Sequence, residues 1–227
     1  MGKESFFPIV TWVILMLNIA FFIFSFDDFS ILFSSIFHWV EYSNKFIQDF
    51  GLYPSKILQK PYILITHLFI HDGWIHLIIN MMIFVGVGVL LERRIGSLNF
   101  SLLYFFSGFF AVLLNLLTRV IFILPNIPSV GSSGAIFGMI YLAAIICSDE
   151  EIPIIFVPIL NILSIFTYLM NLKIKVPLLK AAIFYTVFSL LIIILKPGNL
   201  TQLTHFGGIL GGIIYFLVMN PGKNVND

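Results

Sequence analysis

A succession of long apolar runs, separated by short polar breaks, constrains the fold of this chain more than any other feature. The runs that we consider as membrane spans are Phe7–Phe26, Trp74–Leu91, Leu98–Leu117, Gly134–Cys147, Ile152–Met170, Val176–Leu195 and His205–Met219. About 20 apolar residues in a helix cross the hydrocarbon core of a bilayer. In lipid each such segment must be a helix, because it has to satisfy its own backbone hydrogen bonds. The pattern predicts an all-α polytopic membrane protein.

The composition agrees with this class and excludes several others. Of the 227 residues, 59% are hydrophobic and 10% charged, whereas a soluble domain averages about 45–50% and about 25%. The net charge of +1 gives no sign of a nucleic-acid partner. The one cysteine, Cys147, cannot form an internal disulfide and is expected to pack as a small apolar residue. No Cys/His spacing resembles a zinc site.

We interpret residues 1–227 as a single membrane domain. The first run, Phe7–Phe26, lacks a small-residue cleavage site, so it is expected to be a retained anchor rather than a signal peptide. Residues 27–60 form a long first loop, whose apolar stretch Phe29–Val40 is too short to cross and is suited to the membrane interface. A loose loop is the alternative. Residues 220–227 are a short polar tail.

The positions of the ionisable residues narrow the search for chemistry. Every acidic residue falls outside or at the edge of the apolar runs, so we expect no carboxylate deep in the membrane. Histidines behave differently, and polar groups inside apolar segments are costly and usually functional. The histidines at the start of or inside apolar segments are His67, His71, His76 and His205.

The first polar motif places His76 and Asn80 four residues apart. On a helix this spacing puts both side chains on one face, so that two donors can converge on one point and hold an oxyanion. The alternative is that both residues only hydrogen-bond between neighbouring helices, as polar residues in membranes often do.

The second motif is Gly131-Ser132-Ser133-Gly134. Glycines around a serine allow a tight turn into a helix and leave a hydroxyl beside the first N–H groups of that helix. Ser133 is therefore a candidate nucleophile. The alternative is packing alone, because Gly134 and Gly138 form an ordinary small-xxx-small pattern.

The third motif begins at His205 and continues with two pairs of glycines, Gly207 with Gly211 and Gly208 with Gly212. These glycines clear a helix face so that a partner packs backbone to backbone, which would hold His205 close to that partner. A lone histidine at a helix start is otherwise simply interfacial.

Together the three motifs supply the groups that acyl transfer needs. A serine requires a base to become a nucleophile, and His205 is the only histidine in the C-terminal half. Acyl transfer needs a nucleophile, a base and donors for the oxyanion. The candidates for these roles are Ser133, His205, and His76 with Asn80. Because no acid is expected deep in the membrane, Ser133 and His205 form a dyad rather than a triad.

Four motifs, all between Leu52 and Met219, stand in the order that one known family uses. They are His71-xxxx-His76-xxx-Asn80, Glu92-Arg-Arg-Ile-Gly96, Gly131-Ser-Ser133-Gly134 and His205-xx-Gly208-xxx-Gly212. In these residues the chain resembles the rhomboid intramembrane serine proteases.

The resemblance implies a six-helix core in which Ser133 attacks a peptide bond and His205 takes and returns its proton. It implies that His76, Asn80 and the backbone N–H of Ser133 stabilise the oxyanion. It further implies a single-pass transmembrane protein as substrate, cut in or near its span, with membrane lipid as the surroundings and no metal or cofactor.

The chain departs from the family pattern in three places. Rhomboids often carry a Trp-Arg pair in the first loop, where this chain has Tyr62-Ile63. They often carry Tyr four residues after the nucleophile, where this chain has Phe137, which can stack on a histidine but cannot donate a hydrogen bond. The third departure is Ile152–Met170, an additional apolar segment between the Ser and His helices.

Parity allows only one of the two runs after the Ser helix to cross the membrane. Ser133 and His205 must open to the same side, so the chain between them crosses an even number of times. We expect Val176–Leu195 to be the fifth span, because prolines in Ile152–Met170 would leave backbone groups unsatisfied in lipid. Ile152–Met170 would then prolong the preceding helix or lie on the cytoplasmic face.

The distribution of Lys and Arg favours a cytoplasmic N-terminus in a multi-pass protein of the cell membrane, with the active site facing the outer leaflet. Cytoplasmic segments would carry Lys3, Arg93, Arg94, Lys173, Lys175, Lys180 and Lys223. Outer segments would carry Lys45, Lys56, Lys60, Arg119 and Lys196.

Two other classes stay open. A non-catalytic relative could keep the fold and bind or unfold membrane clients, but Ser133 and His205 are both present, which argues against it. A small transporter or channel could use the buried histidines as a proton path. It would be expected to carry a membrane-embedded acid or an inverted repeat, and the sequence shows neither.

Overall fold

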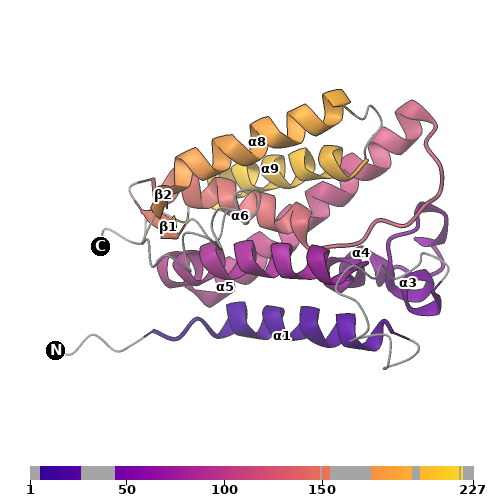
Figure 1. Ribbon diagram of the computed structural model, residues 1–227, viewed down its shortest axis with the longest axis horizontal. Helices are drawn as coiled ribbons and strands as arrows, with labels where there is room; N and C mark the ends of the chain where they lie inside the picture. The colour runs from indigo at the N-terminus through magenta and orange to yellow at the C-terminus, as the bar shows by residue number, and fades with distance from the viewer. Residues whose placement is uncertain are drawn as a thin grey trace.

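The computed structural model of the chain describes residues 6–26, 44–148, 150–153, 175–195, 200–219 and 221. Its elements are α1 (Ile9–Phe24), α3 (Lys45–Phe50), η1 (Pro54–Lys56), α4 (Ile63–Thr66), η2 (His67–Phe69), α5 (Trp74–Phe122), α6 (Ser133–Ile146), β1 (Glu151–Pro153), β2 (Lys175–Pro177), α8 (Leu178–Leu195) and α9 (Leu200–Met219). The long helices lie side by side, with α3 and α4 at one end of the molecule and β1 and β2 at the other (Figure 1).

The predicted all-α polytopic membrane fold is confirmed. Within the described residues, α5, α8 and Thr201–Met219 of α9 are long and apolar enough to cross a membrane, and α1 and α6 are shorter apolar helices. The C-terminal helix begins at Leu200, earlier than the expected start at His205. The stretch Phe29–Val40, expected at the interface, lies outside the described residues.

The helix α5 consists of two antiparallel halves that meet at Gly96. Gly96 has φ +80° and ψ 159°, which are not helical values. The rings of Phe84 and Phe100 are 6.2 Å apart, whereas 16 residues of straight helix would separate them by about 24 Å. The chain therefore turns back at Gly96. The two halves, residues 74–95 and 97–122, contain the expected spans Trp74–Leu91 and Leu98–Leu117.

Glu92 joins this turn to the start of α1. Its carboxylate accepts hydrogen bonds from the backbone N–H groups of Val10 and Thr11 at 2.9 and 2.7 Å. It also accepts from the hydroxyls of Thr11 and Ser97, both at 2.7 Å. The first N–H groups of a helix have no intrahelical partner, so an anion there stabilises the helix. Glu92 stands at the edge of its run as expected, but its side chain is fully buried.

A short two-stranded sheet connects α6 to α8. Glu151, Ile152 and Pro153 pair antiparallel with Pro177, Val176 and Lys175. The chain therefore reaches α8 on the side where α6 ends, and the expected helix in Val176–Leu195 is present as α8. The idea that Ile152–Met170 prolongs the preceding helix is wrong, because α6 ends at Ile146 and Ile152 lies in β1. Residues 154–174 lie outside the described residues.

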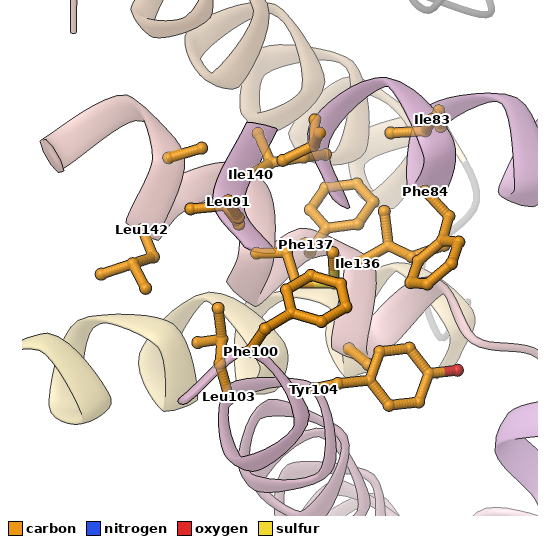
Figure 2. Packing of buried hydrophobic residues seen from close by; sticks show 14 of the residues in the cluster. Ile83, Phe84, Leu91, Phe100, Leu103, Tyr104, Ile136, Phe137, Ile140 and Leu142 are labelled. Atoms are coloured by element: carbon orange, nitrogen blue, oxygen red, sulfur yellow. The ribbon is translucent and has the colours of Figure 1, made fainter. Parts of the chain in front are cut away.

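The core fills the space between both halves of α5 and helix α6. Figure 2 shows Phe84, Phe100 and Tyr104 from α5 beside Ile136 and Phe137 from α6. The rings of Phe84 and Tyr104 meet edge to face at 5.7 Å. Such pairs add to the stabilisation that burial alone provides.

Glycines allow α9 to lie against both of its neighbours. A methyl group at Gly208 would overlap the backbone of Gly134, and one at Gly212 would overlap the backbone of Gly138. On the other face of α9, a methyl at Gly207 would lie 2.6 Å from the carbonyl oxygen of Phe110 in α5. The helix axis of α9 can approach α5 and α6 this closely only because these positions carry no side chain.

We expect Gly208→Ala to lower the free energy of unfolding by about 1–3 kcal/mol, because the backbones of α6 and α9 must separate to accept the methyl group. Thermal unfolding in detergent measures the change. Leu210→Ala on the same helix is the matched control, since Leu210 is 48% exposed and surface changes usually stay within about 0.5 kcal/mol. Equal effects of the two changes would contradict this account of the packing.

Candidate active site

Ser133 and His205 come together where α6 begins. Ser133 is the first residue of α6, and His205 lies in the second turn of α9. The Nε2 atom of His205 and the hydroxyl oxygen of Ser133 are hydrogen-bonded at 3.0 Å, although 72 positions separate the residues in the chain. A serine hydroxyl this close to an imidazole nitrogen can lose its proton to that nitrogen as it attacks.

Phe137 holds the ring of His205 from one side. The two rings are stacked, with centroids 4.0 Å apart and planes 10° apart. Phe137 follows Ser133 by one helical turn, so α6 supplies both the hydroxyl and the stacking surface. The Nδ1 atom of His205 is buried and has no hydrogen-bond partner within the described residues. Packing, and not a carboxylate, therefore orients the imidazole in this part of the chain.

Gly131 brings the chain before Ser133 against His76. Its φ of +110° is one that residues with a side chain rarely adopt. A methyl group there would lie 2.9 Å from both Cε1 and Nε2 of His76 and 3.8 Å from the amide nitrogen of Asn80. His76 and Asn80, one turn apart in α5, thus face the same short stretch of backbone, just before the serine.

The amide nitrogen of Asn80 is buried and has no hydrogen-bond partner in the described part of the chain. A buried donor without a partner costs about 1–3 kcal/mol, so its presence close to Ser133 requires an explanation. An oxygen that arrives with a substrate would satisfy it.

His67, in the segment that leads into α5, makes two hydrogen bonds to its surroundings. The Nδ1 of His67 donates to the carbonyl of Ile63 at 2.9 Å, and the carbonyl of His67 accepts from the N–H of Gly131 at 3.0 Å. Burial lowers the pKa of His67 to about 4. Burial, followed by the proximity of His76, holds the pKa of His71 well below its ordinary value. Both rings are therefore neutral near pH 7.

The structure shows one contact that the sequence reasoning missed. A carboxylate oxygen of Asp72 lies 2.6 Å from the Nδ1 of His76. The sequence places Asp72 among the acids at the edges of the runs, but an acid at that edge still reaches the site. The four-residue spacing of Asp72 and His76, read like that of His76 and Asn80, is the signal that indicates the contact.

Arg119 is a second residue that the sequence reasoning missed, since its expected place is an outer segment. It lies in the last turn of α5, is 6% exposed, and donates to Asn115 at 2.8 Å, to the Pro125 carbonyl at 2.5 Å and to the Ser129 hydroxyl at 3.1 Å. Asn115 in turn donates to Ser129 at 3.1 Å and to the hydroxyl of Thr204 at 3.0 Å. The network joins α5, the segment before the serine and the residue before the histidine.

The first loop is attached to the same segment. Leu52 and Ser129 exchange two backbone hydrogen bonds, each 3.0 Å long. Asn126 donates to the hydroxyl of Ser55 at 2.7 Å. These contacts anchor the loop at positions other than Tyr62-Ile63, where Ile63 is buried and Tyr62 is exposed.

These groups line a cavity of about 100 Å³ that includes Ser133, His76, Asp72, Asn115 and Arg119. A volume of this size holds a few water molecules, which hydrolysis of an acyl-enzyme would require. Among the described residues no group of three or more His, Cys, Asp or Glu is placed to hold a metal ion.

The fold and these motifs define a class. Residues 58–221 match the family model described as the Rhomboid domain. The chain therefore belongs to the rhomboid family, which confirms the resemblance found in the sequence. It is an integral membrane protein of an intramembrane peptidase family.

Three relatives illustrate the similarity. Rhomboid-like protease 1 of Toxoplasma gondii is 28% identical over 176 residues, which are 77% of this chain and 52% of the relative. RHOMBOID-like protein 4 of Arabidopsis thaliana is 39% identical over 92 residues, 40% of this chain and 22% of the relative. Inactive RHOMBOID-like protein 8 of the same plant is 36% identical over 77 residues, 34% of this chain and 20% of the relative. The chain thus spans about half or less of the length of these relatives.

We expect Arg119→Met to lower the melting temperature by about 5 °C or more, because the buried acceptors on Asn115 and Pro125 lose their donor and the hydroxyl of Ser129 loses one of its two donors. Arg119→Lys should restore only part of the loss, since one ammonium cannot reach three separate acceptors. Thermal unfolding in detergent measures both. Arg94→Met, at an exposed position of α5, is the control; a fall as large as that of Arg119→Met would argue against the network.

Proposed function

We propose that the chain is a serine endopeptidase that cleaves single-pass transmembrane proteins within or near their membrane span, with Ser133 as nucleophile and His205 as base. The observation that carries the proposal is the 3.0 Å hydrogen bond between the hydroxyl of Ser133 and Nε2 of His205. Family membership alone does not carry it, because one relative is named inactive.

In the proposed reaction, the Ser133 oxygen attacks the carbonyl carbon of the scissile bond while its proton passes to Nε2 of His205. The carbonyl oxygen becomes an oxyanion, which accepts hydrogen bonds from Asn80, from His76 and from the N–H of Ser133. His205 then protonates the leaving amine, and an acyl-enzyme remains on Ser133. Water, deprotonated by His205, releases the acid product. No cofactor takes part in these steps.

The place of the site supports the choice of substrate. His205 is in the second turn of α9, about 7.5 Å along the helix from its start. Ser133 lies at the start of α6, which begins partway along the bundle and not at either of its ends (Figure 1). A peptide bond that reaches Ser133 therefore lies within the depth of the bundle, as a bond within a transmembrane helix does.

We infer that the end of the bundle with α3 and α4 faces outward and that the N-terminus is cytoplasmic, in the cell membrane. Arg93 and Arg94 lie exposed beside Gly96, where the two halves of α5 meet, and Lys or Arg near a span favours the cytoplasmic side. Cysteines placed at Arg94 and at Ser55, labelled from outside intact cells, test the orientation. Labelling at Arg94 and not at Ser55 would reverse it.

A fluorophosphonate probe and a reporter transmembrane substrate test the assignment of the dyad. We expect Ser133→Ala to abolish labelling, and Ser133→Ala and His205→Ala each to lower cleavage by about 10³-fold or more. Ser132→Ala is the matched control, because it removes the adjacent hydroxyl and leaves the bond between Ser133 and His205 in place. Labelling that survives Ser133→Ala, or cleavage untouched by either change, would refute the proposal. It would favour a client-binding protein instead.

Asn80→Ala tests the oxyanion role separately. We expect kcat to fall by about 10²–10³-fold with KM nearly unchanged, because the donor acts on charge that develops in the transition state. The melting temperature should stay the same or rise, since the change removes a buried donor that has no partner within the described residues. An unchanged turnover number would exclude this role for Asn80.

A further inference from the structure

Arg119 is a buried cation that has no carboxylate partner within the described residues. Its side chain is 6% exposed, and its three acceptors are an amide oxygen, a backbone carbonyl and a hydroxyl, all of them neutral. The ion pairs of the described residues, Lys60 with Asp49 and His76 with Asp72, do not include it. A guanidinium stays charged in proteins, and buried charges are as a rule paired. An ionisable residue in a membrane protein that lacks such a partner indicates a functional site.

The guanidinium of Arg119 is able to bind a further acceptor. It has five N–H groups, and its three hydrogen bonds use one from each nitrogen. The two that remain, one on each Nη atom, can bind a carboxylate through one oxygen or both. The three bonds also hold the side chain in one position, so little conformational entropy is lost when an anion binds. The guanidinium is thus a preorganised site for an anion.

Arg119 and Ser133 line the same cavity of about 100 Å³. Asn115 and Thr204 lie between them. The Nε of Arg119 is 2.8 Å from Oδ1 of Asn115, whose amide nitrogen is 3.0 Å from the hydroxyl of Thr204. The methyl group of Thr204 is 3.6 Å from the place where a methyl at Gly134, the neighbour of Ser133, would lie. A substrate side chain that enters the cavity beside Ser133 therefore points towards the guanidinium, and a long side chain reaches it best.

The reaction decides which side chain of the substrate enters this cavity. The leaving amine must lie beside His205, because His205 gives it a proton. His205 is not one of the residues that line the cavity, whereas Ser133 is. The cavity is therefore on the acyl side of the scissile bond. It takes the side chain of the residue that supplies the scissile carbonyl, which we call the acyl residue.

We propose that Arg119 selects substrates in which the acyl residue is glutamate, by binding its carboxylate. The inference rests on the proposed function and narrows the substrate class to single-pass proteins with an acidic residue at the cleavage site. Glutamate is preferred to aspartate because its additional methylene reaches further into the cavity. A carboxylate within a transmembrane helix is costly in lipid, and the cation offsets this cost. Arg119 determines specificity and touches none of the reacting atoms.

The volume and the charges of the cavity fit a glutamate side chain. A cavity of about 150 Å³ holds benzene, with six heavy atoms, so a volume of about 100 Å³ suits the five heavy atoms of this side chain better than a large aromatic one. Asp72 also lines the cavity, but its carboxylate is held by His76 at 2.6 Å. If Asp72 instead balanced Arg119 across the cavity, a charge on the acyl residue would make no difference to cleavage.

Two reporter substrates that differ only in the acyl residue, glutamate against glutamine, test the inference. Glutamine keeps the shape and removes the charge. We expect kcat/KM of the wild-type protein to be about ten-fold or more higher for glutamate, and Arg119→Met to abolish this preference. Arg119→Lys should retain part of it, because a cation remains. Both substrates meet the same preparation, so the ratio does not depend on how much of a variant is folded. Mass spectrometry of the products checks that the same bond is cut.

Lys56→Met is the matched control. Lys56 lies over the ring of Tyr53 in the first loop, 4.4 Å from its centroid, and is not one of the described residues that line the cavity. Removing its charge should leave the ratio unchanged. A ratio near one in the wild-type protein would overturn the inference. A ratio that survives Arg119→Met, or that Lys56→Met abolishes as well, would also overturn it.

Binding without cleavage separates the inference from the proposed function. In Ser133→Ala protein, fluorescence anisotropy measures the Kd of labelled transmembrane peptides that carry glutamate or glutamine as the acyl residue. No product carboxylate forms, so a difference reports the side chain alone. We expect the glutamate peptide to bind about ten-fold or more tightly, and Arg119→Met to remove the difference. Equal Kd values would overturn the role of Arg119 even if the dyad is correct. A difference that depends on Arg119 would support it even if Ser133 proved not to be the nucleophile.

Discussion

The close approach of α9 to α6 is the contact on which the site depends. Lipid chains are as apolar as the helices, so burial of apolar surface drives little association between helices in a membrane, and close packing has to supply the attraction. Gly208 lies directly on the backbone of Gly134. Ser133 precedes Gly134, and His205 stands one turn before Gly208 on α9. The same contact therefore sets the distance between hydroxyl and imidazole, and a movement that separated the helices would separate the two groups.

The polar groups around this contact are of two kinds. Some have hydrogen-bond partners: Asn115 and Arg119 hold the segment before the serine in place through their hydrogen bonds. Others are left without partners: the amide nitrogen of Asn80 and the Nδ1 of His205 are buried and unpaired within the described residues. The first kind makes the site rigid, and the second leaves polar atoms available in it at a cost in stability.

Much of this arrangement could be predicted from the sequence, because the signals are local or depend on the solvent. Apolar runs must be helices in lipid, which predicts α8, α9 and both halves of α5. Glycines four residues apart in α9 indicate a face for close packing. Gly207 and Gly211 form one such face, against α5, and Gly208 and Gly212 form another, against α6. The contacts of Asp72 and Arg119 could not be found from their distance to the apolar runs. Arg119 lies in α5 because this helix continues to Phe122, beyond the expected end of the run at Leu117. Asp72 lies just before α5, and its side chain reaches back to the first turn of that helix.

The sequence by itself determined the class of fold, the family and the residue types available for chemistry, since a chain this apolar has few polar side chains to place. Only the tertiary structure decided which of them meet. Ser133 and His205 are brought together by helices that are distant in the chain, and Glu92 is bound to the start of α1 rather than to water. The pairing of β1 with β2 likewise decided where α8 begins. The physical reason is that local sequence controls helix formation, whereas the register of one helix on another depends on how all the side chains of both faces fit at once.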